Sequence, residues 1–394
     1  MIQKTELPFT KKIKRIFVVK ILINTRFLLK DKLEGIGWFS FEVARRLAQW
    51  HPEIEFVYAF DRAFDESFIT SDNIKPVVLF PPARHPFLFY AFFEWAMPSL
   101  IKKEKPDLFF SPDGFLSLSS NVPTVLTIHD LAYLHFPEQV SWIQEKYYAH
   151  YVPKFAHHAS RITTVSTYTK NDIIDKFGIE DKKIDVTYNG YNLSYAPISE
   201  AEKQKVKNTF SQGEDYFLYV GSIHPRKNIP NILRAFEQFK SKENSKIKLV
   251  LVGRMAWQTS EVGAVYDKMK YKNDVIFLGY QSIENLHKIV AAAFANVYVS
   301  FFEGFGIPIL ESLKSGVPVI ASNTSSMPEV LGNAGLLVEP SNVEHIAQAM
   351  QAFYKDEKLR LDCAEKGLLQ SEKFSWDYTA QKVWKSIETV LTKS

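Results

Sequence analysis

The sequence is poor in features that mark several classes of protein. It has a single cysteine, Cys363, so no disulfide can form within the chain, and a reducing compartment is expected. The longest weakly charged run, IVAAAFANVYVSFF (289–302), is shorter than the ~20 residues that a membrane-spanning helix needs. No two aspartates stand two residues apart, so an Asp-x-Asp metal site is missing. No GxGxxG follows the first strand of either half, which argues against a dehydrogenase.

Net charge and chain length further limit the class of ligand and the number of domains. The net charge of +4 is too small to indicate nucleic acid, but it suits an anionic ligand or an anionic membrane surface. The 394 residues favour two domains of ordinary globular composition. The early apolar run IFVVKILI is split by Lys20 and has no small-residue cleavage site, so we interpret it as a strand and not as a signal peptide.

Short apolar runs alternate with helix-like stretches along the whole chain. They are nearly continuous in hydrophobicity, which is typical of strands buried on both faces of a parallel sheet. The runs are RIFVVKILI (15–23), EFVYAF (55–60), PVVLF (76–80), DLFFSP (107–112), TVLTIHD (124–130), RITTVS (161–166), DVTYNG (185–190), YFLYVGS (216–222), KLVLVG (248–253), VIFLGY (275–280), NVYVSFF (296–302), PVIAS (318–322) and GLLVEP (335–340). This alternation predicts an α/β fold of two doubly wound parallel-sheet domains.

The polar stretch 191–204 is interpreted as the linker between these domains. We therefore expect one domain over residues 1–192, a second over 193–373 and a C-terminal helix over 374–394. Ser375 is the expected N-cap of that helix. Its apolar face could pack on either domain.

The segment FFEGFGIPILE (301–311) follows a predicted strand, where ligands bind in open α/β sheets. Gly304 and Gly306 let the backbone approach a ligand, and the following helix offers a positively polarised N-terminus, which together favour a phosphate. Glu303 and Glu311 could accept hydrogen bonds from sugar or ribose hydroxyls. The alternative is a plain strand–turn–helix with two solvated acids.

A second phosphate signal follows the strand YFLYVGS. In GSIHPRKN (221–228), Arg226 and Lys227 could neutralise a diphosphate, or could form a solvated basic turn. Both signals fall on one predicted sheet, so each supports the other.

The motifs FEGFGIPILES, SGVPVIAS and MPEVLGNAGLLVEP resemble the signature block of the retaining glycosyltransferases of family 4, which have the GT-B fold of two Rossmann-like domains facing a cleft. GSIHPRKN, LEGIGWFSFEVARRLA, TIHDLAYLHFPE and ITTVSTYTKND extend the resemblance over nearly the whole chain. IHDLAYLHFPE and VGRMAWQ look most like bacterial mannosyltransferases of polysaccharide and O-antigen assembly.

The resemblance implies a donor site in the second domain. Glu311 would hold the ribose, and Glu303 the hydroxyls of the transferred sugar. The backbone of Gly304, Phe305 and Gly306 would lie beside the sugar and phosphates. Together with Glu303, the implied catalytic residues are His129, Arg226 and Lys227.

The remaining implied donor contacts come from both domains. Gly35 and Gly37 match the glycine loop that closes on the phosphates, and His129 matches a first-domain histidine near the reacting sugar. Ser222 stands where some relatives have arginine, so more of the phosphate charge would rest on Arg226 and Lys227.

The implied reaction transfers a hexose from a nucleotide sugar to a glycan or lipid-linked glycan held by the first domain. Mannose is the hexose that the resemblance favours. GDP-mannose is favoured as donor, with a UDP-sugar as the other choice. Neither metal nor cofactor is expected, and retention would follow from same-face attack. A nucleotide-sugar epimerase of the same architecture and a non-catalytic nucleotide-sugar sensor are the alternatives.

The stretch HPFLFYAFFEWAMPSLIKKEK (85–105) combines aromatic residues with a basic end. This suits either an interfacial helix on an anionic membrane or a core helix with a charged end, which Pro98 should bend or split. We expect a cytoplasmic protein, with peripheral contact to the inner face of the membrane as an open choice. The pair His157–His158 lacks further ligands at metal spacing and is interpreted as helix surface.

Overall fold

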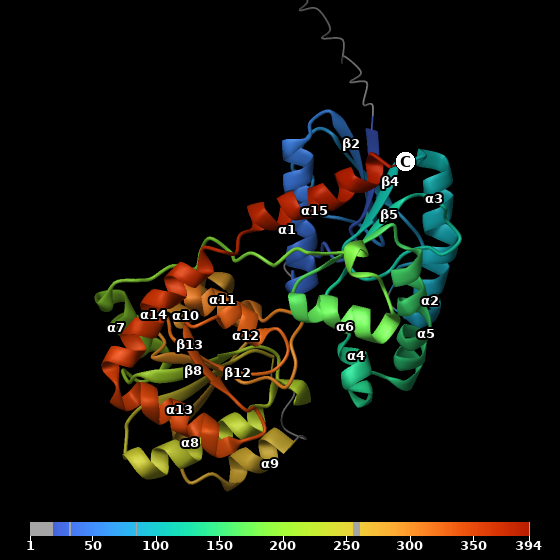
Figure 1. Cartoon of the computed structure of the whole chain (residues 1–394). Coiled ribbons are helices and arrows are strands. Elements are labelled where there is room, and N and C mark those ends of the chain that lie inside the picture. The colour runs from blue at the N-terminus through green and yellow to red at the C-terminus, as the bar shows by residue number, and fades with distance from the viewer. Residues whose placement is uncertain (1–18, 31–32, 84, 255–260, 394) are drawn as a thin grey trace, which may run out of the picture.

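The computed structural model describes residues 19–30, 33–83, 85–254 and 261–393. They form two α/β halves, each built on one sheet, which lie side by side (Figure 1). Every strand pair is parallel, as the continuous apolar runs predict. Residues 15–18 of the predicted strand over 15–23, and residues 255–258 of VGRMAWQ, lie outside the described residues.

The sheet of the N-terminal half has seven strands in the order β3-β2-β1-β4-β5-β6-β7. Its strands are β1 (Val19–Asn24), β2 (Ile54–Phe60), β3 (Ile74–Val78), β4 (Leu108–Ser111), β5 (Thr124–Ile128), β6 (Arg161–Thr164) and β7 (Ile184–Val186). The register places Ile21 between Phe56 of β2 and Leu108 of β4.

The sheet of the C-terminal half has six strands in the order β10-β9-β8-β11-β12-β13. Its strands are β8 (Tyr216–Val220), β9 (Lys248–Val252), β10 (Val275–Gly279), β11 (Ala295–Tyr298), β12 (Val319–Ser322) and β13 (Gly335–Val338). All thirteen predicted runs therefore overlap a strand, although the bounds differ by a few residues.

The helices of the N-terminal half cover both faces of its sheet. They are α1 (Gly35–Trp50), α2 (Pro86–Ala91), the π-helix η2 (Phe92–Ala96), α3 (Met97–Glu104), α4 (Ala132–His135), α5 (Trp142–His158) and α6 (Thr167–Phe177), with short turns η1 (Glu66–Phe68), η3 (Pro137–Gln139) and η4 (Asp181–Lys183). The π-helix lies just before Pro98, whose missing N–H interrupts the helical ladder at the place the sequence predicts.

The remaining helices follow β7 in the chain, and all but the last belong to the C-terminal half. They are α7 (Glu200–Phe210), α8 (Ile229–Glu243), α9 (Glu261–Lys268), α10 (Ile283–Ala291), α11 (Ile307–Lys314), α12 (Met327–Leu331), α13 (Val343–Lys355), α14 (Glu357–Ser371) and α15 (Trp376–Leu391), with short turns η5 (Pro225–Lys227) and η6 (Lys272–Asp274). The polar stretch 191–204 is a linker only in part, because α7 begins within it behind a capping box of Ser199 and Glu202.

Helix α15 returns from the C-terminal half and lies beside α1 of the N-terminal half (Figure 1). Ser375 caps it by accepting a hydrogen bond from the Tyr378 N–H, as predicted. The two segments that join the halves touch each other, since a Cβ on Gly190 would lie 2.2 Å from the Trp376 nitrogen. Two segments therefore connect the halves, one after β7 and one before α15, and they lie side by side.

Each sheet changes its winding direction between two neighbouring strands, and this point positions the site. In the C-terminal half it lies between β8 and β11, whose carboxyl ends lead into GSIHPRKN and FFEGFG. In the N-terminal half it lies between β1 and β4, and β1 leads towards α1. Ligands of doubly wound sheets bind at such points.

Candidate active site

Three charged side chains meet at the winding change of the C-terminal sheet. Arg226 and Lys227 end the η5 turn after β8, and Glu303 follows β11. Lys227 Nζ lies 2.6 Å from Glu303 Oε1, and Arg226 Nη1 lies 3.4 Å from Oε2. The Glu303 side chain is only 9% exposed, so this is a buried ion cluster and not a pair of solvated turns.

The surroundings keep Glu303 ionised. Burial alone would raise its pKa, but Lys227 and Arg226 outweigh burial and hold the pKa below the usual value for glutamate. The Tyr298 hydroxyl donates to Glu303 Oε1 at 2.9 Å, and its ring stacks on Tyr219 at 6.0 Å between centroids. Burial raises the pKa of both tyrosines, so they stay neutral donors. Sequence reasoning missed them because tyrosines within apolar strands look like core residues.

Two helix N-termini approach each other beside this cluster. Helix α1 begins at Gly35 and α11 begins after Gly306, whose φ of +101° favours glycine. Neither helix has an acidic residue in its first turn or a side-chain cap. A Cβ on Gly35 would lie 4.0 Å from Ile307 Cδ1, so the two ends are neighbours across the halves. Their free N–H groups and positive dipole ends suit an anion.

Glu311 lies one turn into α11 and is partly buried. Burial raises its pKa to about 8, against a smaller opposing effect of a hydrogen bond with Tyr195. Burial therefore favours the protonated form of this carboxyl. Tyr195 is 1% exposed although it lies in the stretch interpreted as linker, so the sequence offers no reason to expect it beside Glu311.

His129 follows β5, and its ring packs edge-on against Phe39 of α1 at 4.9 Å between centroids. Its Nε2 is 2.7 Å from the Pro112 carbonyl, which can only accept, so the proton of the neutral ring is on Nε2. Burial is the main cause that lowers its pKa. The His129 carbonyl would lie 2.4 Å from a Cβ on Gly304, so the two segments are in close backbone contact.

The other predicted donor residues have different surroundings. Gly37 is buried in α1, where a Cβ would lie 2.9 Å from the Phe27 carbonyl. The ring of Phe305 packs on Phe374 at 5.7 Å, so only its backbone can face a ligand. Ser222 is exposed beyond β8.

Among the residues that the structure describes, no three His, Cys, Asp or Glu side chains gather as a metal site would require. The exposed pair His157–His158 at the end of α5 contributes to none.

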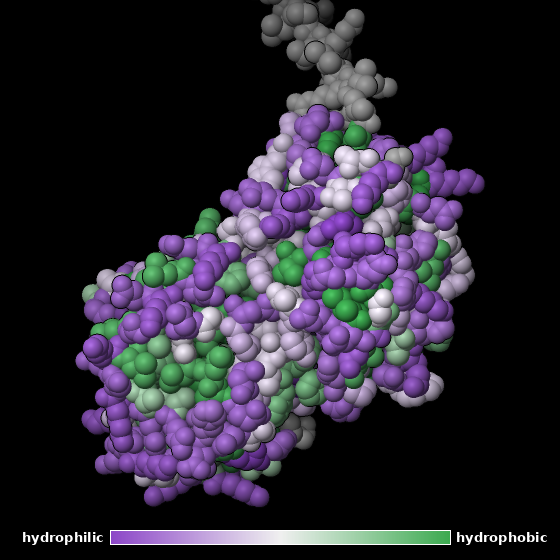
Figure 2. All heavy atoms as spheres, viewed as in Figure 1, coloured by the Kyte–Doolittle hydropathy of each residue, from purple (hydrophilic) through white to green (hydrophobic). Residues whose placement is uncertain are grey.

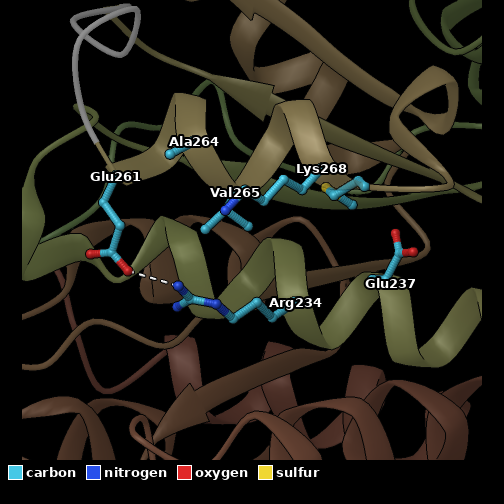
Figure 3. Close-up of a pocket in the computed structure, with 7 residues that line it drawn as sticks. Arg234, Glu237, Glu261, Ala264, Val265 and Lys268 are labelled. Atoms are coloured by element: carbon cyan, nitrogen blue, oxygen red, sulfur yellow. Dashed lines mark hydrogen bonds and ion pairs between the residues drawn. The ribbon is translucent and has the colours of Figure 1, made fainter.

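Two neighbouring hollows share lining residues, and the larger of them lies next to the turn that carries the cations. One of about 590 Å³ is lined by Phe136 of the N-terminal half and by His224 and Asn231 of the other half. One of about 360 Å³ lies between α8 and α9 (Figure 3). Arg234 and Glu261 line both and form an ion pair at 2.8 Å, drawn as a dashed line in Figure 3.

Comparisons with known proteins agree with this architecture. A family model described as Glycosyltransferase Family 4 matches residues 33–195, and one described as Glycosyl transferases group 1 matches residues 200–370. The chain is 30% identical to O-antigen chain mannosyltransferase B of Escherichia coli over 376 residues, which cover 91% of this chain and 97% of that protein. It is also 30% identical to the O-antigen chain mannosyltransferase RfbU of Salmonella typhimurium, over 72% of this chain and 78% of that one.

Solved structures confirm the fold expected from the sequence. Sucrose-phosphate synthase from Thermosynechococcus elongatus superposes with a TM-score of 0.79 at 18% identity, covering 95% of this chain and 100% of that one. Anabaena HepE in complex with UDP and glucose superposes with a TM-score of 0.73 at 18% identity, covering 94% and 100%. At this identity the likeness shows the fold alone, which is the GT-B arrangement.

Proposed function

The chain belongs to glycosyltransferase family 4, and from that premise we propose that it transfers mannose, with retention and without a metal, from GDP-mannose to a glycan or lipid-linked glycan. Mannose is proposed because relatives that align over most of the chain are named mannosyltransferases of O-antigen chains.

One observation carries the proposal: four positively polarised groups converge where the halves meet. They are Arg226, Lys227 and the uncapped N-termini of α1 and α11. A diphosphate matches them in charge and in its number of acceptor oxygens. Glu311, one turn into α11, is then placed for the ribose of the same nucleotide.

The same groups suit the bond changes of the transfer. The bond between C1 of the sugar and the diphosphate oxygen breaks, and the acceptor hydroxyl oxygen forms the new bond to C1. Arg226, Lys227 and the two helix ends stabilise the charge that develops on the departing diphosphate. Glu303 is held by both cations, so we assign it to the sugar hydroxyls and not to nucleophilic attack. A departing phosphate oxygen takes the acceptor proton on the same face.

The donor is tested by a thermal-shift panel of GDP, UDP, ADP and their sugars, because a ligand of the native state raises its stability. We expect the largest rise with GDP and GDP-mannose, and a larger rise with a UDP-sugar would reassign the donor. Lys227→Met should abolish the rise. Lys366→Met is the control, because Lys366 lies on α14 and, among the described residues, forms its ion pair with Asp362 of its own helix.

Turnover tests the remaining parts. Transfer of mannose to an oligomannose acceptor should continue in EDTA and give a product with the anomeric configuration of the donor. Activity that EDTA abolishes and magnesium restores would disprove metal independence, and inversion would disprove same-face attack. Incubation with GDP-mannose alone should leave the sugar unchanged, whereas an epimerised sugar would favour the epimerase alternative.

We also propose that an aromatic surface of the N-terminal half contacts the inner face of an anionic membrane. No helix among the described residues has both the length and the apolar character to cross a membrane. Phe87 and Trp95 of the α2–η2 run are 73% and 66% exposed, and exposed Lys102 and Lys103 follow on α3. Exposed aromatic rings next to lysines suit the interface of an anionic bilayer. In Figure 2, hydrophilic residues cover most of the visible face of the molecule.

Sedimentation with vesicles of anionic lipid tests this surface. The wild-type chain should bind at low salt, and a Phe87→Ser/Trp95→Ser variant should not. Leu369→Ser is the control, because Leu369 is 61% exposed on α14 of the other half and should not affect binding. Equal sedimentation of all three chains would remove the aromatic surface from the membrane contact.

A further inference from the structure

A carboxylate of the C-terminal half caps a helix of the N-terminal half. Glu329, on α12, accepts hydrogen bonds from the N–H groups of Thr167 at 3.0 Å and Tyr168 at 3.1 Å. These residues begin α6, which has no acidic residue of its own in its first turn. A carboxylate at this end satisfies two of the helix's unpaired N–H groups and its positive dipole.

The linker strengthens this contact. The Tyr188 hydroxyl lies 3.2 Å from Glu329 Oε2 and 3.0 Å from Thr167 Oγ1, so it bridges both sides. Tyr188 follows β7 at the place where the chain leaves the N-terminal half. The contact therefore joins α6, the linker and α12.

Three residues before Glu329, the start of α12 holds the loop of the active site. The Ser326 hydroxyl, at the start of α12, lies 2.9 Å from the carbonyls of both Glu303 and Phe305, and its one proton can be donated to either or shared between them. The helix that binds α6 through Glu329 is thus the helix that fixes the loop carrying Glu303.

In the N-terminal half, the contact extends through α6 to the segment that carries His129. The Thr169 hydroxyl, in the first turn of α6, lies 3.2 Å from the His129 carbonyl and 3.5 Å from the Gly304 carbonyl. Beside it, Phe302 of the C-terminal half packs on Tyr168 at 5.7 Å between ring centroids. A path of direct contacts therefore runs from Glu329 to both parts of the active site.

We propose that Glu329 is a positioning residue for sugar transfer, which sets the register of the two halves so that the His129 segment meets Glu303 and Gly304. The proposal rests on the transfer reaction described above. It assigns no contact with substrate to Glu329. Arg226, Lys227 and Glu311 lie in the C-terminal half, and of the groups assigned to the nucleotide only the N-terminus of α1 comes from the other half. Nucleotide binding should therefore depend on this contact less than transfer does.

Glu329→Ala tests the proposal, with Ser282→Ala as the matched control. Ser282 caps α10 within the C-terminal half, so its loss removes a helix cap without touching the other half. Both variants should lose a similar, small amount of melting temperature. Glu329→Ala should lower kcat at least about tenfold, whereas the Kd for GDP should weaken by a smaller factor, because most of its binding groups lie in the C-terminal half. Glu329→Gln can accept a hydrogen bond from only one of the two N–H groups, so its kcat should lie between that of Glu329→Ala and that of the wild type.

Small-angle scattering in the presence of GDP gives a readout independent of turnover. Glu329→Ala should show a larger radius of gyration than the wild type, and Ser282→Ala should not. A kcat of Glu329→Ala equal to that of the control, or a Kd that weakens as much as kcat falls, would overturn the proposal. A wild-type chain that transfers no mannose would instead count against the proposed function, and the scattering comparison would still decide the role of Glu329.

Discussion

Replacing Gly304 by alanine should separate catalysis from nucleotide binding. The new Cβ would lie 2.4 Å from the His129 carbonyl oxygen, 3.0 Å from Asp130 Cβ and 3.2 Å from Asp130 Oδ2. Ordinary contact begins near 3.4 Å, so the two segments must move apart by about 1 Å. The obstacle is a backbone atom, which cannot rotate away as the end of a side chain could.

The magnitude follows from where this movement acts. Gly304 is not among the glycines with positive φ, so alanine brings a steric effect without backbone strain. A misplacement of about 1 Å between reacting groups can lower turnover ~100-fold. Overpacking costs about 1–3 kcal/mol in a rigid core. We expect the lower end here, because the halves can open slightly.

The assay compares kcat for mannose transfer with the Kd for GDP from calorimetry, in the wild type, Gly304→Ala and Gly304→Ser. We expect kcat to fall about 100-fold in the alanine variant and further in the serine variant, with Kd changed only a few-fold. An alanine variant that turns over at the wild-type rate would show that the contact between Gly304 and His129 is not kept during transfer. That result would refute the reasoning.

Three further outcomes follow from the same site. Glu311 has a folded-state pKa raised to about 8 from 4.5, so the folded protein holds a proton that the unfolded chain releases, and its stability should fall as the pH rises from 4.5 to 8. Glu311→Gln should not show this loss. Equal melting curves at pH 5 and pH 8 for both chains would contradict the prediction. Lys227→Met leaves buried Glu303 with Arg226 at 3.4 Å, so denaturant titration should show a loss of about 1–3 kcal/mol, and transfer should fall by ~100-fold or more. His129→Ala should lower turnover with little change in melting temperature, and near-normal turnover would remove His129 from the site.

The fold could be predicted well from the sequence for a simple physical reason. Strands buried on both faces must be apolar over their whole length, so each of the thirteen appears as a compact run. The charged part of the site was predictable for a related reason. Parallel strands end at one edge of their sheet, so residues that follow two strands, such as Lys227 and Glu303, come together.

Other parts depend on contacts between distant positions that no local pattern records. Tyr195 looks like a linker residue and Tyr298 like a core residue, until Glu311 and Glu303 are placed beside their hydroxyls. Glu329 caps a helix that begins 162 positions earlier in the chain. The start of α7, in contrast, was predictable from a local pattern. The capping box of Ser199 and Glu202 lies within the stretch that we interpreted as linker.

The double connection between the halves restricts how the molecule can move. Gly190 and Trp376 touch where the two connecting segments cross, and the Thr379 hydroxyl lies 2.5 Å from the Tyr188 carbonyl. A single tether would permit twisting and sliding, whereas two tethers fastened together leave mainly rotation about one axis. A donor seated on the C-terminal half would then meet α1 in the same alignment each time. Distances measured between pairs of fluorescent labels should all vary along one coordinate, and independent variation would show a looser joint.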